Sequence, residues 1–280
     1  MGIVKRVAAV VVPLGLVVGG VWYGVSRHDS GDDKTLGECT TKVGRLTVVL
    51  TDEQARNASL ISAIAIRRGM PAHAATIGLA TALQESKLYN LRGGDRDSLG
   101  LFQQRHSQGW GTPQQILDPV YATNAFYDAL TKVPNWARLP VTEAAQEVQR
   151  SGYPSAYAVY EGDARALASA LTGYSPASFW CHLPRPRAAP PPATRRAVGL
   201  RESLAPAFGP VEVRVGSGNR IELAASSPAR GWAVASYLVA HAAQLGISTV
   251  GFRDREWSVE SNRGWRHASD SATADSVVIG

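Results

Sequence analysis

The sequence predicts a multidomain protein with a transmembrane helix at its N-terminus, an all-α domain in the middle and a small α/β domain at its C-terminus. Three features favour this fold class: an apolar run near the N-terminus, a proline- and arginine-rich segment at 184–197, and a change from helical to alternating apolar patterns beyond it. At 280 residues the chain exceeds the usual size of one domain. Its hydrophobic fraction of 45% argues against a disordered protein.

The chain carries a net charge of +6, which is spread along the sequence. An excess this modest suits any polyanion, including wall polymers, anionic lipids and nucleic acids. The sequence has no block rich in Lys and Arg and no nucleic-acid-binding motif, so we expect no nucleic-acid partner.

The apolar run VAAVVVPLGLVVGGVWYGV at 7–25 is long enough to cross a bilayer core. It follows Lys5 and Arg6 and ends near the aromatic pair Trp22 and Tyr23, which suits a membrane interface better than a signal-peptide cleavage site. We predict an uncleaved signal anchor, with a cleaved secretory signal as the alternative. The positive-inside rule then places residues 1–6 in the cytoplasm and the later domains outside, as parts of a single-pass protein of the cell membrane.

Outside the membrane we expect four segments. These are a polar stalk at 26–38, the all-α domain at 39–183, a stiff linker at 184–197 and the α/β domain at 198–280. Cys39 and Cys181, the two cysteines of the chain, lie at the two ends of the all-α domain. In an oxidising compartment a single pair of cysteines is most simply a disulfide, and two unpaired buried thiols are the alternative.

Helix signals follow one another through the all-α domain. Thr51 and Gln54 form a capping box before an Ala- and Ile-rich stretch that Gly69 ends. Pro71 opens a second helix, PAHAATIGLATALQES, whose apolar residues cover much of its circumference, so we expect it in the centre of the core. This helix delivers Glu85 at its C-terminal end. Further helices are expected at 113–117, 120–131, 141–151 and 163–171.

Three short motifs lie at the end of the second helix and just beyond it: Gln84-Glu85-Ser86, Gly94-Asp95-Arg96 and Leu99-Gly100-Leu101-Phe102-Gln103. Together they resemble the signature of lysozyme-like lytic transglycosylases and goose-type lysozymes. The resemblance implies a lysozyme-like domain in which Glu85 is the general acid toward the β-1,4 bond between N-acetylmuramic acid and N-acetylglucosamine. It also implies that a turn containing Gly100 and Gln103 lines the sugar cleft.

The chemistry of glycoside cleavage agrees with this resemblance. A carboxylic acid must protonate the leaving oxygen, while a second carboxylate or the substrate's own acetamido group stabilises the oxocarbenium ion. Asp95 resembles the second carboxylate of goose-type enzymes, although its spacing from Glu85 is shorter here. A further Asp of those enzymes is absent, since Gln104 and Arg105 follow the motif. This difference favours a lytic transglycosylase with a 1,6-anhydro product over inverting hydrolysis.

We therefore predict Glu85 and Asp95 as catalytic residues. A second set comes from the helix end, the glycine turn and a Tyr-containing segment that resembles the end of actinobacterial and actinophage wall-lytic domains. We predict that this set binds substrate, with packing in the core as the alternative for its aromatic members: Ser86, Gly100, Phe102, Gln103, Tyr153 and Tyr157. We expect no cofactor and no metal.

The C-terminal domain combines strand-like alternation with an amphipathic helix, GWAVASYLVAHAAQL, that Gly246 ends. Its order of elements, with Gly264-Trp265 and a final Asp275-Ser276-Val277-Val278-Ile279, resembles a degenerate relative of zinc D-alanyl-D-alanine carboxypeptidase-like domains. Ser276 and Val278 stand where active members of that family have histidine ligands, so we expect neither zinc nor peptidase activity. Such a domain would bind wall peptide stems or a wall-associated protein, or would serve as a structural cap.

These observations lead to two functional hypotheses. The first is a membrane-anchored, extracytoplasmic enzyme that cleaves the glycan strands of peptidoglycan, as a lytic transglycosylase or a muramidase. The second is a non-enzymatic wall-binding or scaffold protein that keeps a lysozyme-like fold. The two hypotheses differ in what Glu85 does, because a scaffold should tolerate its replacement and an enzyme should not.

Overall fold

The computed structural model describes residues 37–153, 155–184, 191–216, 220–261, 263–268 and 275–280. The predicted cytoplasmic N-terminus and transmembrane helix, 1–6 and 7–25, lie outside these ranges, as does most of the predicted stalk. Within them, we find no helix with the length and apolar character needed to cross a membrane.

The fold class of the chain is mixed α/β, and the prediction of an all-α middle domain is wrong. A three-stranded antiparallel sheet with the order β2-β1-β5 frames this part of the chain. Its strands are β1 (Glu38–Val43), β2 (Leu46–Thr51) and β5 (Phe179–His182). β1 and β2 form a hairpin around Gly44, whose φ of 59° suits the tight turn between them. The predicted disulfide is confirmed, and it joins Cys39 on β1 to Cys181 on β5.

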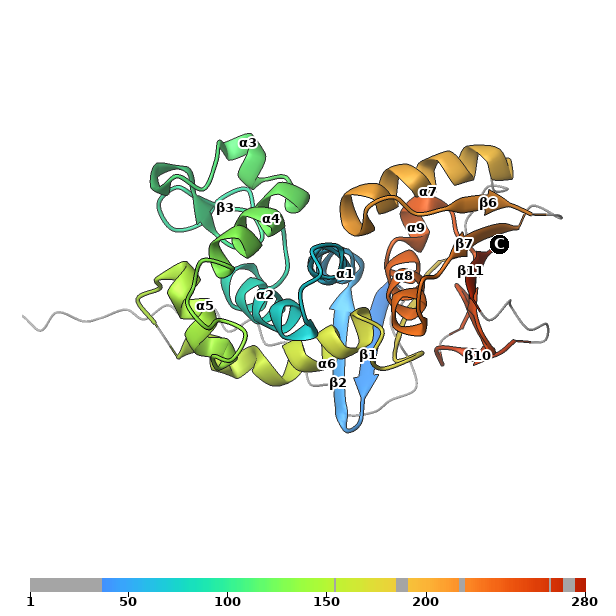
Figure 1. The fold of residues 1–280 in the computed structure, drawn as a ribbon, viewed down its shortest axis with the longest axis horizontal. Coiled ribbons are helices and arrows are strands. Elements are labelled where there is room, and N and C mark those ends of the chain that lie inside the picture. The colour runs from blue at the N-terminus through green and yellow to red at the C-terminus, as the bar shows by residue number, and fades with distance from the viewer. Residues whose placement is uncertain (1–36, 154, 185–190, 217–219, 262, 269–274) are drawn as a thin grey trace, which may run out of the picture.

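The helices of this part surround one central helix (Figure 1). That helix is α2 (Ala72–Ser86), which is buried along most of its length and packs against α1, α5 and α6. The capping box of Thr51 and Gln54 is confirmed at the start of α1. The remaining elements are α1 (Asp52–Arg67), β3 (Ser98–Leu99), β4 (Gln104–Arg105), the 3-10 helix η1 (His106–Gln108), α3 (Pro113–Ile116), α4 (Pro119–Leu130), α5 (Val141–Gln149), the 3-10 helix η2 (Ala156–Tyr160) and α6 (Glu161–Leu171).

The C-terminal part is built on a six-stranded antiparallel sheet with the order β10-β9-β8-β11-β7-β6. The longest helices beside it are α7 (Ala193–Phe208), which begins inside the segment expected to be a linker, and α8 (Pro228–Ala240). The other elements are β6 (Val213–Val215), β7 (Ile221–Ala224), α9 (Ala242–Leu245), β8 (Thr249–Phe252), β9 (Arg255–Ser258), β10 (Arg266–His267) and β11 (Ser276–Ile279).

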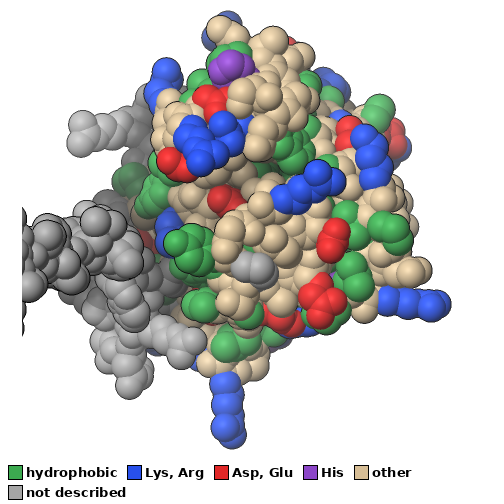
Figure 2. All heavy atoms as spheres, turned by 90° about the vertical axis from the view of Figure 1, so that its left-hand side faces the viewer, with side chains coloured by type: hydrophobic (Ala, Val, Ile, Leu, Met, Phe, Trp, Pro, Cys, Tyr) green, Lys and Arg blue, Asp and Glu red, His purple; other side chains and the backbone are tan. Residues whose placement is uncertain are grey.

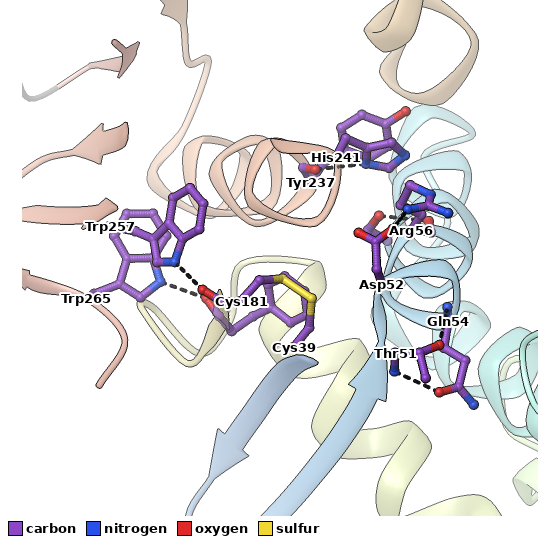
Figure 3. Close-up of a disulfide and its surroundings, with 12 residues drawn as sticks. Cys39, Thr51, Asp52, Gln54, Arg56, Cys181, Tyr237, His241, Trp257 and Trp265 are labelled. Atoms are coloured by element: carbon purple, nitrogen blue, oxygen red, sulfur yellow. Dashed lines mark hydrogen bonds and ion pairs between the residues drawn. A yellow bond between two sulfur atoms is a disulfide. The ribbon is translucent and has the colours of Figure 1, made fainter. Parts of the chain in front are cut away.

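The two parts of the chain share one continuous hydrophobic core. Helix α8 packs against α1, α6 and β5. Two buried tryptophans of the C-terminal part also donate to backbone carbonyls of β5 (Figure 3): Trp257 Nε1 lies 2.9 Å from Cys181 O, and Trp265 Nε1 lies 2.7 Å from Phe179 O. Strand β5 is therefore held by its pairing with β1 and by these two tryptophans of the C-terminal part.

Candidate active site

Glu85 lies in the last turn of α2 and is half-buried. The hydroxyl of Tyr157, a fully buried residue of η2, donates to Glu85 Oε1 over 2.7 Å. Burial raises the pKa of Tyr157, and the neighbouring charge of Glu85 raises it further. The phenol is therefore protonated at neutral pH and available as a donor, which fixes the direction of the Glu85 carboxyl group.

The chain leaves α2 through two residues in the left-handed backbone region, Lys87 with φ 56° and Leu88 with φ 64°. Such conformations are uncommon for residues other than glycine and need support from their surroundings. The first turns of α1 provide it, because Gln54 Nε2 donates to Lys87 O over 2.8 Å and Asn57 Nδ2 donates to Leu88 O over 2.7 Å. Helix α1 thus fixes the backbone that follows Glu85.

The Gly-Leu-Phe-Gln motif forms the turn between β3 and β4. Gly100 has φ 75°, and a Cβ there would lie 2.6 Å from Ile116 O, so a larger residue would not fit. Gln103 also has a positive φ, 47°, and its side-chain amide donates to Gly100 O over 3.2 Å. Ser86 Oγ donates to Leu101 O over 2.7 Å, which ties the residue after Glu85 to this turn. The structure thus links Tyr157 to Glu85, and Ser86 to the turn that contains Gly100 and Gln103.

The side chain of Phe102 points into the core instead of outward. It is fully buried and stacks on Phe126 with 4.5 Å between ring centroids. Its carbonyl oxygen accepts a hydrogen bond of 2.8 Å from Gln149 Nε2 on α5. In this arrangement no sugar ring can reach the Phe102 ring, whereas Tyr153, with 79% of its surface exposed, is open to solvent.

The two aspartates after α2 differ sharply in their surroundings. The Asp95 side chain is 93% exposed, and it forms an ion pair of 3.9 Å with the adjacent Arg96. Asp97 is not part of the motifs singled out in the sequence. Its carboxylate accepts hydrogen bonds from Ser107 N over 2.9 Å and from Arg105 Nε over 2.6 Å. These hydrogen bonds hold the pKa of Asp97 well below its usual range, and those from Ser107 have the largest effect. Asp97 is thus an ionised carboxylate that closes the β3–β4 hairpin, in which Ser98 pairs with Arg105. No signal in the sequence indicates this role, because the partners of Asp97 meet it only through the fold.

A shallow hollow of about 630 Å³ lies beside α5 and reaches Ser155, between Tyr153 and Tyr157, although none of the predicted substrate-binding residues lines it. It is lined by Val133, Pro134, Leu139, Thr142, Glu143, Gln146, Glu147 and Ser155. Figure 2 shows that the face of the molecule on the α5 side mixes acidic and basic side chains without a patch of one sign. Within the described ranges, no three His, Cys, Asp or Glu side chains are grouped closely enough to hold a metal ion.

Comparison with known proteins concerns the C-terminal part. A family model described as VldE, C-terminal domain, matches residues 216–277, which reach from the end of β6 into β11. Ser276 lies on β11 inside this segment, and Val278 lies one residue beyond it, where it pairs with Glu222 and Gly251 on the neighbouring strands. No curated protein matches the chain. The residues around Glu85 lie outside the matched segment.

Proposed function

We propose that this protein cleaves the glycan strands of peptidoglycan and that Glu85 is the general acid. The proposal depends above all on one observation: a carboxyl group at the end of a buried helix is oriented by a buried tyrosine hydroxyl and tied through Ser86 to the Gly100–Gln103 turn. The resemblance of these motifs to lytic transglycosylases and goose-type lysozymes supports the same chemistry.

In the proposed reaction, the Glu85 carboxyl group donates its proton to the glycosidic oxygen while the bond from that oxygen to C1 breaks. The acetamido group of the substrate stabilises the positive charge at C1. The 6-hydroxyl oxygen then attacks C1, and its proton returns to Glu85, which leaves a 1,6-anhydro product. This route needs a single protein carboxyl group, which agrees with the exposed position of Asp95. Tyr157 keeps the carboxyl group in place throughout, because its hydroxyl can donate to either protonation state.

We further propose that the protein works outside the cytoplasm, with peptidoglycan as its partner. The disulfide between Cys39 and Cys181 supports this location, because such bonds persist in oxidising compartments. The C-terminal part would then be a non-catalytic module that contacts the wall or a wall-associated protein.

The test is to incubate the full chain, with its disulfide intact, with purified peptidoglycan and to analyse the released muropeptides by mass spectrometry. Glu85→Gln is the key variant, and Glu143→Gln, which changes an exposed carboxylate on α5, is the matched control. We expect anhydro-muropeptides from the wild type and the control and none from Glu85→Gln. Reducing-end products would identify a muramidase instead. If no variant releases products but all of them pellet with the wall, the non-enzymatic hypothesis replaces this one.

A further inference from the structure

Two tyrosines of η2 each contact a different residue at the C-terminal end of α2. A 3-10 helix has three residues per turn, so Tyr157 and Tyr160 project from the same side of η2. Tyr157 meets Glu85, and Tyr160 meets Lys87, two residues further along the chain. The Lys87 ammonium group and the Glu85 carboxyl group therefore face the same side of η2, each on its own tyrosine, without forming an ion pair with one another.

The partners of Lys87 leave its charge largely uncompensated. Its ammonium donates to the Tyr160 hydroxyl and lies 4.4 Å from the centroid of the same ring. An ammonium has three donors, and a neutral phenol satisfies one of them. Among the residues that the structure describes, no carboxylate forms an ion pair with Lys87, although the side chain is partly buried. Gln54 holds the backbone of Lys87, and the Tyr160 hydroxyl and ring hold its ammonium group.

We propose that Lys87 binds a carboxylate of the substrate next to Glu85 and that Tyr160 is a positioning residue for the ammonium group. This inference builds on the proposed function, because peptidoglycan carries carboxylates on its peptide stems close to the glycan, whereas a neutral glycan has none. Hydrogen bonds between two charged groups are stronger than neutral ones, so the loss of Lys87 should weaken binding about tenfold or more.

The experiment compares binding of native peptidoglycan fragments with binding of the same fragments after their carboxylates have been converted to amides. The full chain is used in the Glu85→Gln background, so binding is measured whether or not the protein is an enzyme. Lys87→Met removes the charge, Lys87→Arg keeps it, and Lys132→Met changes an exposed lysine as the matched control. Circular dichroism and urea unfolding establish that each variant is folded.

We expect the Glu85→Gln protein and the Lys132→Met control to bind native fragments about tenfold more tightly than amidated ones. Lys87→Met should bind both alike, and Lys87→Arg should keep most of the preference. If Lys87→Met keeps the full preference for native fragments, or if the starting protein has none, this inference is wrong. Cleavage by the protein that retains Glu85 reports separately on the proposed function, because a charge preference without cleavage would leave Lys87 as a wall-binding residue in a non-enzymatic protein.

Discussion

Acidification should destabilise the protein through one buried histidine. His241 follows α8 and is only 9% exposed, with its ring stacked on Tyr237 at 3.9 Å between centroids (Figure 3). Its Nδ1 lies 2.9 Å from Tyr237 O, and because a carbonyl can only accept, this nitrogen carries the proton of the neutral ring. Burial lowers the pKa of His241 from 6.5 to about 4, and the positive charge of Arg56 on α1 acts in the same direction.

The size of the effect follows from this shift in pKa. Between pH 6.5 and about 4, the histidine of the unfolded chain binds a proton that the native protein excludes. Stability therefore rises with pH across this window and is lost as the pH falls through it. Each unit of pKa difference corresponds to about 1.4 kcal/mol, so the full loss is about 3 kcal/mol.

Urea unfolding of the wild type and of His241→Phe at about pH 7.5 and about pH 4.5 measures this contribution. Phenylalanine keeps an aromatic ring against Tyr237 and does not titrate. We expect the wild type to lose about 2.5 kcal/mol more than the variant between the two pH values. His267→Gln, which changes an exposed histidine, is the control and should behave as the wild type does. If the wild type and His241→Phe lose stability in parallel, the reasoning from burial is refuted.

Three further predictions concern the candidate site and its frame. Tyr157→Phe should lower the free energy of unfolding by about 1–3 kcal/mol in urea, because the Glu85 carboxyl group loses a buried donor; an unchanged midpoint would contradict this. Phe102→Leu should cost about 1 kcal/mol of stability and leave the affinity for glycan fragments unchanged, and a weakened affinity would show that sugar reaches this ring. Reducing the disulfide between Cys39 and Cys181, which are 142 residues apart, should destabilise the chain by up to about 5 kcal/mol in the same assay; a loss below 1 kcal/mol, roughly, would show that β5 is held by its other contacts.

The local features of the fold could be predicted from the sequence because they depend on neighbouring residues. The capping box of Thr51 and Gln54 needs only a hydroxyl and an amide at the right spacing, and both bonds are present. The disulfide was predictable from the cysteine count and the expected compartment. The β1–β2 hairpin is not among the expected elements, because its two strands are short and precede the helix signals that begin at Thr51. The third strand, β5, lies more than a hundred residues later, and no local pattern pairs it with β1.

The candidate site could be predicted only in part, for a similar reason. Glu85 and the Gly100–Gln103 turn form recognisable motifs, so their positions in the sequence were enough to single them out. The left-handed turn at Lys87 depends on Gln54, a residue on another helix, and nothing near Lys87 in the sequence indicates it. Asp95 lies in the expected motif, but the groups that donate hydrogen bonds to a carboxylate in this hairpin, Arg105 and Ser107, contact Asp97 instead. Motif spacing cannot distinguish two aspartates that are two residues apart.

The contacts of β5 connect the C-terminal part to the elements that support the candidate site. Trp257 holds the carbonyl of Cys181, and the disulfide joins that residue to β1. Strand β2 pairs with β1 and leads directly into α1, whose first turn supplies Gln54 to the backbone after Glu85. Each link is a short hydrogen-bonded or covalent contact, so these contacts form a continuous path from the C-terminal sheet to the end of α2. If the C-terminal part contacts the wall as proposed, it does so in a fixed position relative to Glu85, because it shares one core with the part that carries this residue, whereas a module on a flexible linker would not.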